Sequence, residues 1–518
     1  MLLAYTIFSL IAVCLIAAAL RMRGVRLAYI WLVLFISLVA VCLILLIAVP
    51  INVKSFVRPD YFSSGTASVD LIFQLTAENR LAGIGLFTFV LAFLTTDAIS
   101  PRGNQTLFRW FELLISASAV WLVLLAANAW TVLLAWTVLD LVSLLSDLIY
   151  RHRNAADFAP FYLSKFIGSI LLVYIIARAY QASPQNLLGS PIPNLGLWLA
   201  ASVLFHSGLS FSKFPPQPKE DMKYQIVQKF IFLLPNLFLL TVLPQAVVSS
   251  VIGLVSQIIF LAAAIVFALR WFYGKNEFEH LDDLARAFAI MAAYLAVTEN
   301  QQGLVYFLLT IFPIIWIFIY DHRYRGFTAI WVANLALISG LPISLNFIPN
   351  YRMITNGNFL AAAIFSLPMA IFMAGIIRFV VRMRGKFSHF DRISRAVYGV
   401  GLLIPIIVLA FISLTNSPVI NINYIWIGAM QVFSTGLLLF VNSKTNQKKI
   451  EEHKTINLLS GIKGVRIDLK RTTNMVTDLI GEGLHFAASL FEGQGGILWS
   501  IVFLSLLLTI IAFQGGLS

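Results

Sequence analysis

The chain has 518 residues, of which 60% are hydrophobic and 11% are charged, and its formal net charge is +13. A soluble domain carries about 25% charged residues, so this composition excludes a soluble protein and indicates a polytopic membrane protein. The two cysteines, Cys14 and Cys42, lie in apolar runs, which predicts inert buried thiols rather than a disulfide or half of a metal site.

Apolar runs of membrane-crossing length recur along the whole chain. A bilayer core of about 30 Å needs about 20 apolar residues per helix. The first run lacks the features of a cleaved signal peptide, so we expect it to be a retained helix. The sequence therefore predicts an all-α fold with about 16 transmembrane helices, near residues 3–20, 27–49, 81–98, 110–127, 129–150, 158–180, 193–212, 226–244, 247–270, 283–298, 302–320, 325–345, 358–383, 396–414, 420–441 and 497–514.

The distribution of positive charges among the loops agrees with this count of spans. Most of the 36 Lys and Arg residues fall in alternate loops, which by the positive-inside rule are the cytoplasmic ones. Both termini are therefore predicted on the outer side. The net positive charge needs no nucleic acid to explain it, since it marks topology and adds attraction to anionic lipid headgroups.

A different kind of segment separates the last two spans. Residues 442–496 begin as a polar stretch, and their later apolar residues recur at helical spacing among Lys and Arg. This pattern is typical of an amphipathic helix on the inner membrane face, and the alternative is a loop with incidental apolar residues. The expected parts are N-terminal helices (1–127), a first helix bundle (128–270), a second bundle (271–441), the amphipathic segment (442–496) and a final span (497–518).

The sequence contains no soluble catalytic motif. Phosphate-binding, dinucleotide-binding, CxxC, HExxH and Gly-x-Ser-x-Gly patterns are all missing, so we expect no catalytic residues, no metal site and no bound cofactor. Of the seven histidines, only His206 lies clearly within a span. A lone histidine there is more often a packed, hydrogen-bonded residue than a ligand.

Charged side chains within the apolar runs are the remaining candidates for chemistry. An acid or base at bilayer depth costs at least about 2.5 kcal/mol, so it usually faces a partner or a water-filled path. Asp140 lies near the middle of its span, and Asp147 follows two helical turns later on the same face. Lys165 enters the next span from the same side at an intermediate depth. An acid–base–acid ladder of this kind is what a proton relay requires.

Less specific interpretations remain open for each of these residues. Asp147 can belong to the headgroup region, and Asp140 with Lys165 can be a static ion pair that fixes helix packing. Lys229 stands only a few residues into the eighth span, from which its ammonium group can snorkel to the interface.

Several motifs together resemble those of the antiporter-like membrane subunits of respiratory complex I and of Mrp-type cation/proton antiporters. Trp136 and Asp140-Leu141, with Ser146 six residues after the acid, resemble the family's fifth-helix Trp-Glu-Leu pattern. The stretch 163–168, Leu-Ser-Lys-Phe-Ile-Gly, is similar to the opening of the family's sixth helix.

Later motifs follow in the family's order. Asp283-Leu-Ala-Arg286 is similar to its tenth-helix Asp-x-Lys-Arg, and Gly340-Leu341-Pro342 matches the Gly-Leu-Pro of its discontinuous twelfth helix. The resemblance covers nearly the whole chain. It implies partner subunits in a membrane complex, most often in a prokaryotic cytoplasmic membrane.

The chain also departs from the family at its charged positions. The seventh-helix lysine is replaced, or displaced to Lys213 at the helix end, and the eighth-helix histidine falls at Gln228, beside Lys229. In the second half, Gln302 begins a stretch without the family's eleventh-helix His and Lys, and its twelfth-helix lysine falls at Asn350. The candidate proton-relay residues are therefore Asp140, Lys165, Asp147, Lys213, Lys229 and His206.

Three functions are compatible with these patterns. The first is a membrane subunit of a proton- or cation-translocating complex of the complex I, Mrp or membrane-hydrogenase kind, at most a non-redox part of an NADH:quinone oxidoreductase-type enzyme. The second is a non-conducting structural subunit of such a complex. The third is a stand-alone secondary transporter, whose substrate site would lie where helices break near the midplane; Pro235, Pro313, Pro368 and Pro405 are candidate breaks.

Overall fold

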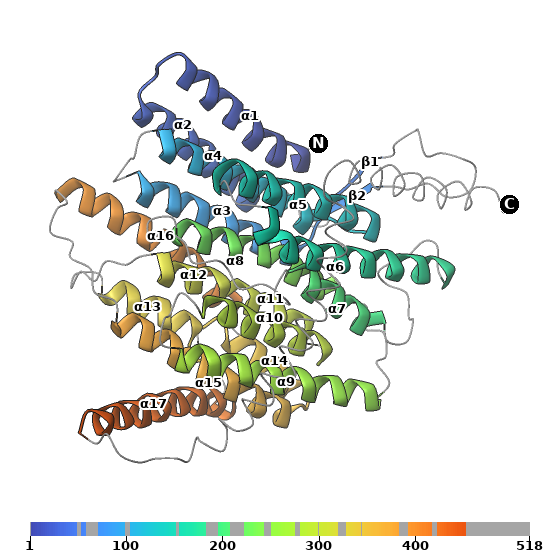
Figure 1. Ribbon diagram of the computed structural model, residues 1–518, viewed down its shortest axis with the longest axis vertical. Helices are drawn as coiled ribbons and strands as arrows, with labels where there is room; N and C mark the ends of the chain where they lie inside the picture. The colour runs from blue at the N-terminus through green and yellow to red at the C-terminus, as the bar shows by residue number, and fades with distance from the viewer. Residues whose placement is uncertain are drawn as a thin grey trace. The chain divides into compact units, whose positions relative to one another are not determined.

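A computed structural model gives the architecture of most of the chain (Figure 1). It describes residues 2–48, 53–57, 71–98, 104–151, 155–182, 195–207, 222–242, 250–274, 280–298, 300–319, 328–342, 344–382, 392–416 and 422–451. Contacts divide the chain into two compact units, of which the first comprises Met1–Val57, Leu71–Asn154 and Phe161–Leu439. All packing considered below lies within this first unit.

The described residues are almost entirely helical, which confirms the predicted all-α fold. Of the sixteen predicted spans, only the last, 497–514, lies outside the described residues, and every other one coincides with one or two helices. The helices are α1 (Leu2–Met22), α2 (Leu27–Leu43), α3 (Ala77–Asp97), α4 (Asn104–Leu125), α5 (Ala129–Arg151), α6 (Ala155–Ala182), α7 (Leu195–His206), α8 (Met222–Phe238), α9 (Ser250–Tyr273), α10 (Leu281–Val297), α11 (Gln301–Leu309), α12 (Ile311–Ile319), α13 (Thr328–Ile338), α14 (Phe347–Thr355), α15 (Phe359–Arg382), α16 (Arg392–Asn416) and α17 (Ile422–Glu451).

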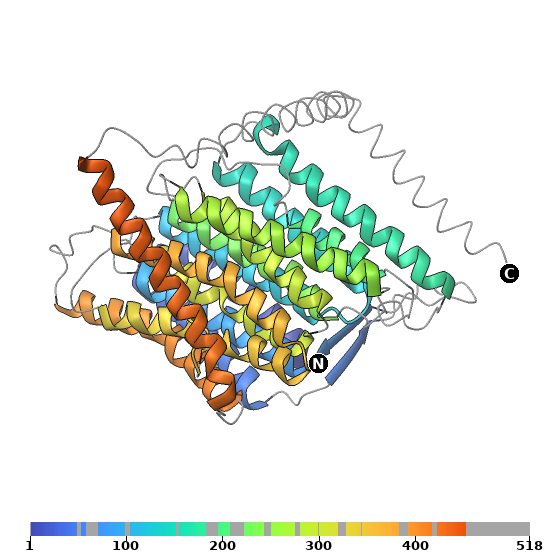
Figure 2. The same cartoon turned by 90° about the horizontal axis from the view of Figure 1, so that it is seen from below.

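Apolar side chains explain both the length and the packing of these helices. Eight of the described helices are long and apolar enough to cross a membrane, and shorter apolar helices accompany them. Helix α3 is buried on almost all sides against α2, α4 and α16, and α9 packs along α10 and α15. Figure 2 shows many of these helices running in roughly similar directions, as in a bundle that crosses a bilayer.

A β-hairpin in the second loop was not predicted from the sequence. Strands β1 (Val53–Val57) and β2 (Leu71–Leu75) pair antiparallel. The hairpin is fixed to the start of α5, because the Ile72 amide donates to Thr131 Oγ1 at 2.8 Å and the Ala127 amide donates to the Ile72 carbonyl at 2.9 Å.

Two predicted spans are broken helices. The span 302–320 is divided at Thr310 into α11 and α12, with Pro313 in the first turn of α12. The span 325–345 ends as α13, and after Gly340 the chain resumes as α14. Gly340 has φ = +78°, a backbone conformation that glycine adopts readily and other residues do not. The Gly-Leu-Pro sequence thus marks a discontinuous helix, as the resemblance implies.

The other candidate prolines do not break their helices. Pro235, Pro368 and Pro405 lie inside α8, α15 and α16, although α8 continues as a 3₁₀ turn at Leu239–Val242.

Helix α17 extends beyond the predicted fifteenth span to Glu451. The polar start of the 442–496 segment, up to Glu451, is therefore helical and continuous with that span. The remainder of this segment and the final span lie outside the described residues.

Candidate functional site

Asp140 and Lys165 form an ion pair, which is one of the arrangements that the sequence left open. Lys165 Nζ lies 2.8 Å from Asp140 Oδ1, joining α5 to α6. The Lys165 side chain is only 4% exposed, whereas 24% of the Asp140 side chain is exposed. The ammonium group also lies 4.9 Å from the ring centroid of Phe161 and 5.4 Å from that of Tyr162, so aromatic faces add to its stabilisation.

His206, at the end of α7, completes the cluster around Asp140. Its Nε2 lies 3.0 Å from Asp140 Oδ2, and its Nδ1 lies 3.0 Å from Asn236 Oδ1 on α8. Trp136 stacks on the imidazole with ring centroids 3.7 Å apart. His206 is fully buried, so this histidine is both packed and a partner of the acid.

The hydrogen bonds of His206 define how many protons the cluster holds. The Asn236 amide group donates from Nδ2 to the Phe232 carbonyl at 3.1 Å, which turns its oxygen toward the ring. In this orientation of the amide, His206 Nδ1 is the donor and Asn236 Oδ1 the acceptor. The contact between Nε2 and Asp140 then needs a second proton, held either on the ring or on the carboxyl group. One proton is shared between a histidine and an acid that also faces a lysine.

Close packing of α6 against α7 brings these groups together. Gly168 has no side chain, and a Cβ there would come within 2.5 Å of the His206 backbone nitrogen. Two serines join the same helices, since Ser202 Oγ donates to the Gly168 carbonyl at 2.7 Å and Ser164 Oγ donates to the Phe205 carbonyl at 2.6 Å.

A second polar cluster lies toward the C-terminal end of α5. The Gln228 amide donates to Glu112 on α4 and, at 3.0 Å, to Ser146 Oγ on α5. One turn back along α5, Ser143 accepts a hydrogen bond of 3.2 Å from the Tyr162 hydroxyl. Polar groups thus continue along α5 from the Asp140 cluster toward this end of the helix.

The sequence prediction did not single out Glu112. An acid in an apolar run was the available signal, but the span was predicted to begin at residue 110, which placed the acid at its edge. Helix α4 begins at Asn104, so Glu112 lies two turns inside it and is 6% exposed. Asn236, which orients His206, was missed because neutral amides give no charge signal.

Lys229 has a charged partner on another helix. Helix α8 begins at Met222, and Lys229 forms an ion pair with Asp282, at the start of α10. The Lys229 side chain is 14% exposed and that of Asp282 is 9% exposed, so both charges are largely buried.

Asp283, the first residue of the motif at 283–289, has a different set of partners. Its carboxylate oxygens lie 3.4 Å from Arg286 Nη1, 3.4 Å from Arg270 Nε and 2.9 Å from His280 Nδ1. These contacts tie the start of α10 to the end of α9. They suit a structural junction between two helices.

Two of the predicted relay residues stay predictions. Asp147 belongs to α5, but its side chain lies outside the part of the chain that the structure describes, and Lys213 lies outside it entirely. Within the described residues, no group of three or more His, Cys, Asp or Glu side chains could hold a metal ion.

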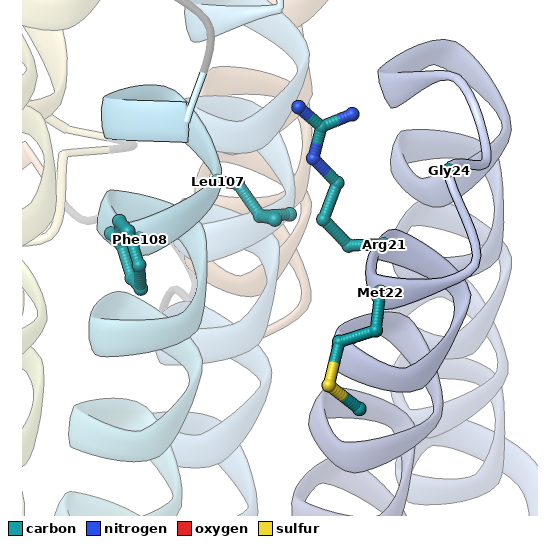
Figure 3. Close-up of a pocket in the computed structure, with 5 residues that line it drawn as sticks. All are labelled: Arg21, Met22, Gly24, Leu107 and Phe108. Carbon is teal, nitrogen blue, oxygen red and sulfur yellow. The ribbon is translucent and has the colours of Figure 1, made fainter.

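A shallow pocket of about 400 Å³ lies away from these clusters, at the end of α1. It is lined by Arg21, Met22, Gly24, Leu107 and Phe108. Figure 3 shows the Arg21 side chain reaching from α1 toward Leu107 on α4.

Solved structures share this fold. A chain of the Mrp complex from Dietzia sp. DQ12-45-1b matches over 99% of this chain and 63% of its own length, with 12% identity and a TM-score of 0.67. A chain of the membrane-bound sulfane sulfur reductase, an archaeal respiratory membrane complex, matches over 98% of this chain and 100% of its own length, at 13% identity and a TM-score of 0.58.

A chain of respiratory complex I from Thermus thermophilus matches over 80% of this chain and 98% of its own length, with 14% identity and a TM-score of 0.56. No protein-family model and no curated protein matches the sequence. The three structural matches confirm the resemblance to complex I and Mrp subunits as a likeness of fold. The chain is an all-α membrane protein with the fold of subunits from these complexes.

Proposed function

We propose that the chain is a membrane subunit of a proton- or cation-translocating energy-converting complex, and that the Asp140–Lys165–His206 cluster is its proton-exchange site. The observation that carries this proposal is the contact of 3.0 Å between His206 Nε2 and Asp140 Oδ2, beside the buried ammonium group of Lys165. The cluster lies in a fold that is also found in chains of a respiratory complex, an Mrp complex and a sulfane sulfur reductase.

The depth and exposure of Asp140 suit this role. The residue lies about 16 Å from the C-terminal end of α5, at 1.5 Å per residue, which is close to mid-bilayer. Its side chain is nevertheless 24% exposed. Because an ionised group at this depth needs a partner or water, the exposed edge of Asp140 can sense charge in a neighbouring subunit.

The mechanism is electrostatic. A negative charge brought near Asp140 from outside the chain disfavours the carboxylate and moves the shared proton from His206 Nε2 to Asp140 Oδ2. Removal of that charge returns the proton to the ring. The polar groups of Ser143, Tyr162, Ser146, Gln228 and Glu112 extend from the cluster along α5 toward one membrane surface, where protons would enter or leave. Redox chemistry would belong to partner subunits.

The remaining expectations for this subunit follow from the loop charges and the resemblance. Both termini would lie on the outer side of a prokaryotic cytoplasmic membrane. The surface at the C-terminal end of α5 would then be the cytoplasmic one.

A non-conducting structural subunit is the second candidate. It is favoured by the neutral residues found at second-half positions where the resembling family has charged ones, such as Asn350, which is 2% exposed, in place of the twelfth-helix lysine. In this alternative the contacts of the Asp140 cluster are static and only fix the packing of α5, α6 and α7.

Purification in mild detergent from native membranes tests membership of a complex. We expect redox subunits or other membrane chains of this fold to co-purify in fixed stoichiometry. A solitary chain that transports a substrate after reconstitution alone would overturn the proposal in favour of a secondary transporter, with its site at the broken helices.

A further inference from the structure

Most of the unpartnered buried polar atoms among the described residues belong to amide side chains in the second half of the chain. Among the described residues, ten buried side-chain nitrogen and oxygen atoms lack a hydrogen-bond partner, and seven of them belong to four amide side chains. These are Asn334, Asn346, Asn350 and Gln431, each no more than 2% exposed. An unsatisfied polar group costs several kcal/mol in the bilayer core, so this concentration calls for a ligand.

Three of the amides follow the broken helix between α13 and α14. Asn346 donates from Nδ2 to the Ile338 carbonyl at 2.8 Å, which leaves only its oxygen without a partner. Asn334 lies one turn before Ile338 on α13, and Asn350 lies one turn after Asn346 on α14. The three amides therefore follow one another along α13, the break and α14, with about one helical turn on either side of the contact between Asn346 and Ile338.

The fourth amide reaches the break from α17. A Cβ at Gly340 would collide with the Gln431 side chain, so this amide lies directly against the turn. A side chain at Gly428 would collide with the Gly340 carbonyl oxygen, which shows that the two backbones approach closely there. Gln431 from α17 and Asn346, through the Ile338 carbonyl, thus both lie next to the break.

The chemistry of the four side chains limits which kind of ligand can satisfy them. Asn334, Asn350 and Gln431 each leave both their amide nitrogen and their amide oxygen unpartnered. A cation would satisfy only the oxygens, and an anion only the N–H groups. The amides carry no charge that would offset a buried ion. Water donates and accepts hydrogen bonds and needs two to four polar partners, which this cluster supplies.

We propose that this amide cluster binds a chain of buried water molecules at the α13–α14 break. The second half of the molecule then holds water in its core without a titratable side chain among the four ligands. This differs from the Asp140 cluster, which holds a proton on side chains. The proposal concerns this half alone and does not depend on the function proposed for the first half.

Radiolytic hydroxyl-radical labelling of the full chain, kept in its native complex or in nanodiscs, tests the proposal. Radicals generated from buried water oxidise the side chains next to it, whatever the access from bulk solvent. Met353, three residues after Asn350, is 1% exposed, and Trp331, three residues before Asn334, is 7% exposed. Met291 and Trp316 are both fully buried elsewhere and are the matched controls.

We expect Met353 and Trp331 to be oxidised several-fold faster than Met291 and Trp316. Equal rates within each pair would overturn the proposal, and this comparison needs no variant.

Two variants give an independent readout. Asn334→Leu and Asn350→Leu remove amide groups and keep similar volume. If water satisfies the amides, each substitution lowers the midpoint of thermal unfolding, and Asn350→Leu also slows the oxidation of Met353. If the amides are dry, removal of unsatisfied polar groups raises the midpoint or leaves it unchanged, which would contradict the proposal.

Discussion

At the scale of single residues, the properties of Asp140 depend on side chains from three other helices. Lys165 contacts one of its oxygens and His206 the other, while Asn236 holds the imidazole in place. The pairing with Lys165 could be foreseen as one alternative because the two residues lie in adjacent spans and Lys165 enters its span from the same side. The role of His206 could not, since hydropathy gives the depth of a helix residue but not which helices are neighbours.

Asn236→Leu tests the orientation of His206. The substitution leaves Nδ1 of a fully buried imidazole without an acceptor, and we expect a loss of about 1–3 kcal/mol in stability. The measurement is the shift in thermal unfolding of the purified protein. Asn416→Leu, at the exposed end of α16, is the control and should change stability by less than about 0.5 kcal/mol. Equal effects of the two substitutions would contradict the assigned role.

Lys165→Met tests the charge balance of the cluster. It removes the ammonium group that contacts Asp140 and leaves a largely buried acid paired only with histidine. Breaking a buried ion pair on one side costs about 3–5 kcal/mol, and solvent at the exposed edge of Asp140 reduces this toward the lower end. The double variant Lys165→Met/Asp140→Leu should recover part of the loss, as measured by thermal unfolding. No recovery would mean that the two charges are not energetically coupled.

At the scale of helices, close contacts between backbones position the site. Gly168→Ala would force the His206 backbone nitrogen away from α6, because a Cβ would come within 2.5 Å of it. We expect a loss of about 1–3 kcal/mol in stability and a displacement of His206 from Asp140. Gly436→Ala is the matched control, since this helical glycine has nothing within 4 Å of its added Cβ. Alanine there should be neutral or stabilise by up to about 1 kcal/mol.

The helices themselves were well predicted because an apolar run of bilayer length has few alternatives to the helical conformation within a membrane. The starts of α4 and α8 were placed several residues too late, since polar first turns such as those of Asn104 and Met222-Lys223 do not score as apolar. The late start predicted for α4 placed Glu112 at the edge of its span, although the residue lies two turns inside the helix. The β-hairpin was missed because its strands are short and depend on contacts with α5.

At the scale of the whole molecule, a largely buried ion pair joins the two halves expected from the sequence. Lys229 belongs to the first expected half (128–270) and Asp282 to the second (271–441), and their side chains connect α8 to α10. This pair was not predicted, because its two residues are distant in sequence. The boundaries of the halves remain a prediction.

Lys229→Met and Asp282→Leu, alone and together, measure this connection. Each single substitution leaves a buried charge without this partner, so we expect a loss of about 3–5 kcal/mol. The double variant should lose less than the sum of the two by about 1–3 kcal/mol in thermal unfolding. Strict additivity would mean that the contact does not hold the halves together.

The central claim is that Asp140 exchanges a proton with His206 during ion translocation. Its most direct test is proton translocation by the intact native assembly carrying Asp140→Asn, measured as the pH gradient formed across closed vesicles. Asparagine keeps the size of the side chain but cannot accept the proton, so we predict loss of translocation with partner subunits still bound. Asp140→Glu, which remains able to accept the proton, should retain part of the activity. Unchanged translocation by the Asp140→Asn assembly would contradict the account and leave the cluster with a purely structural role.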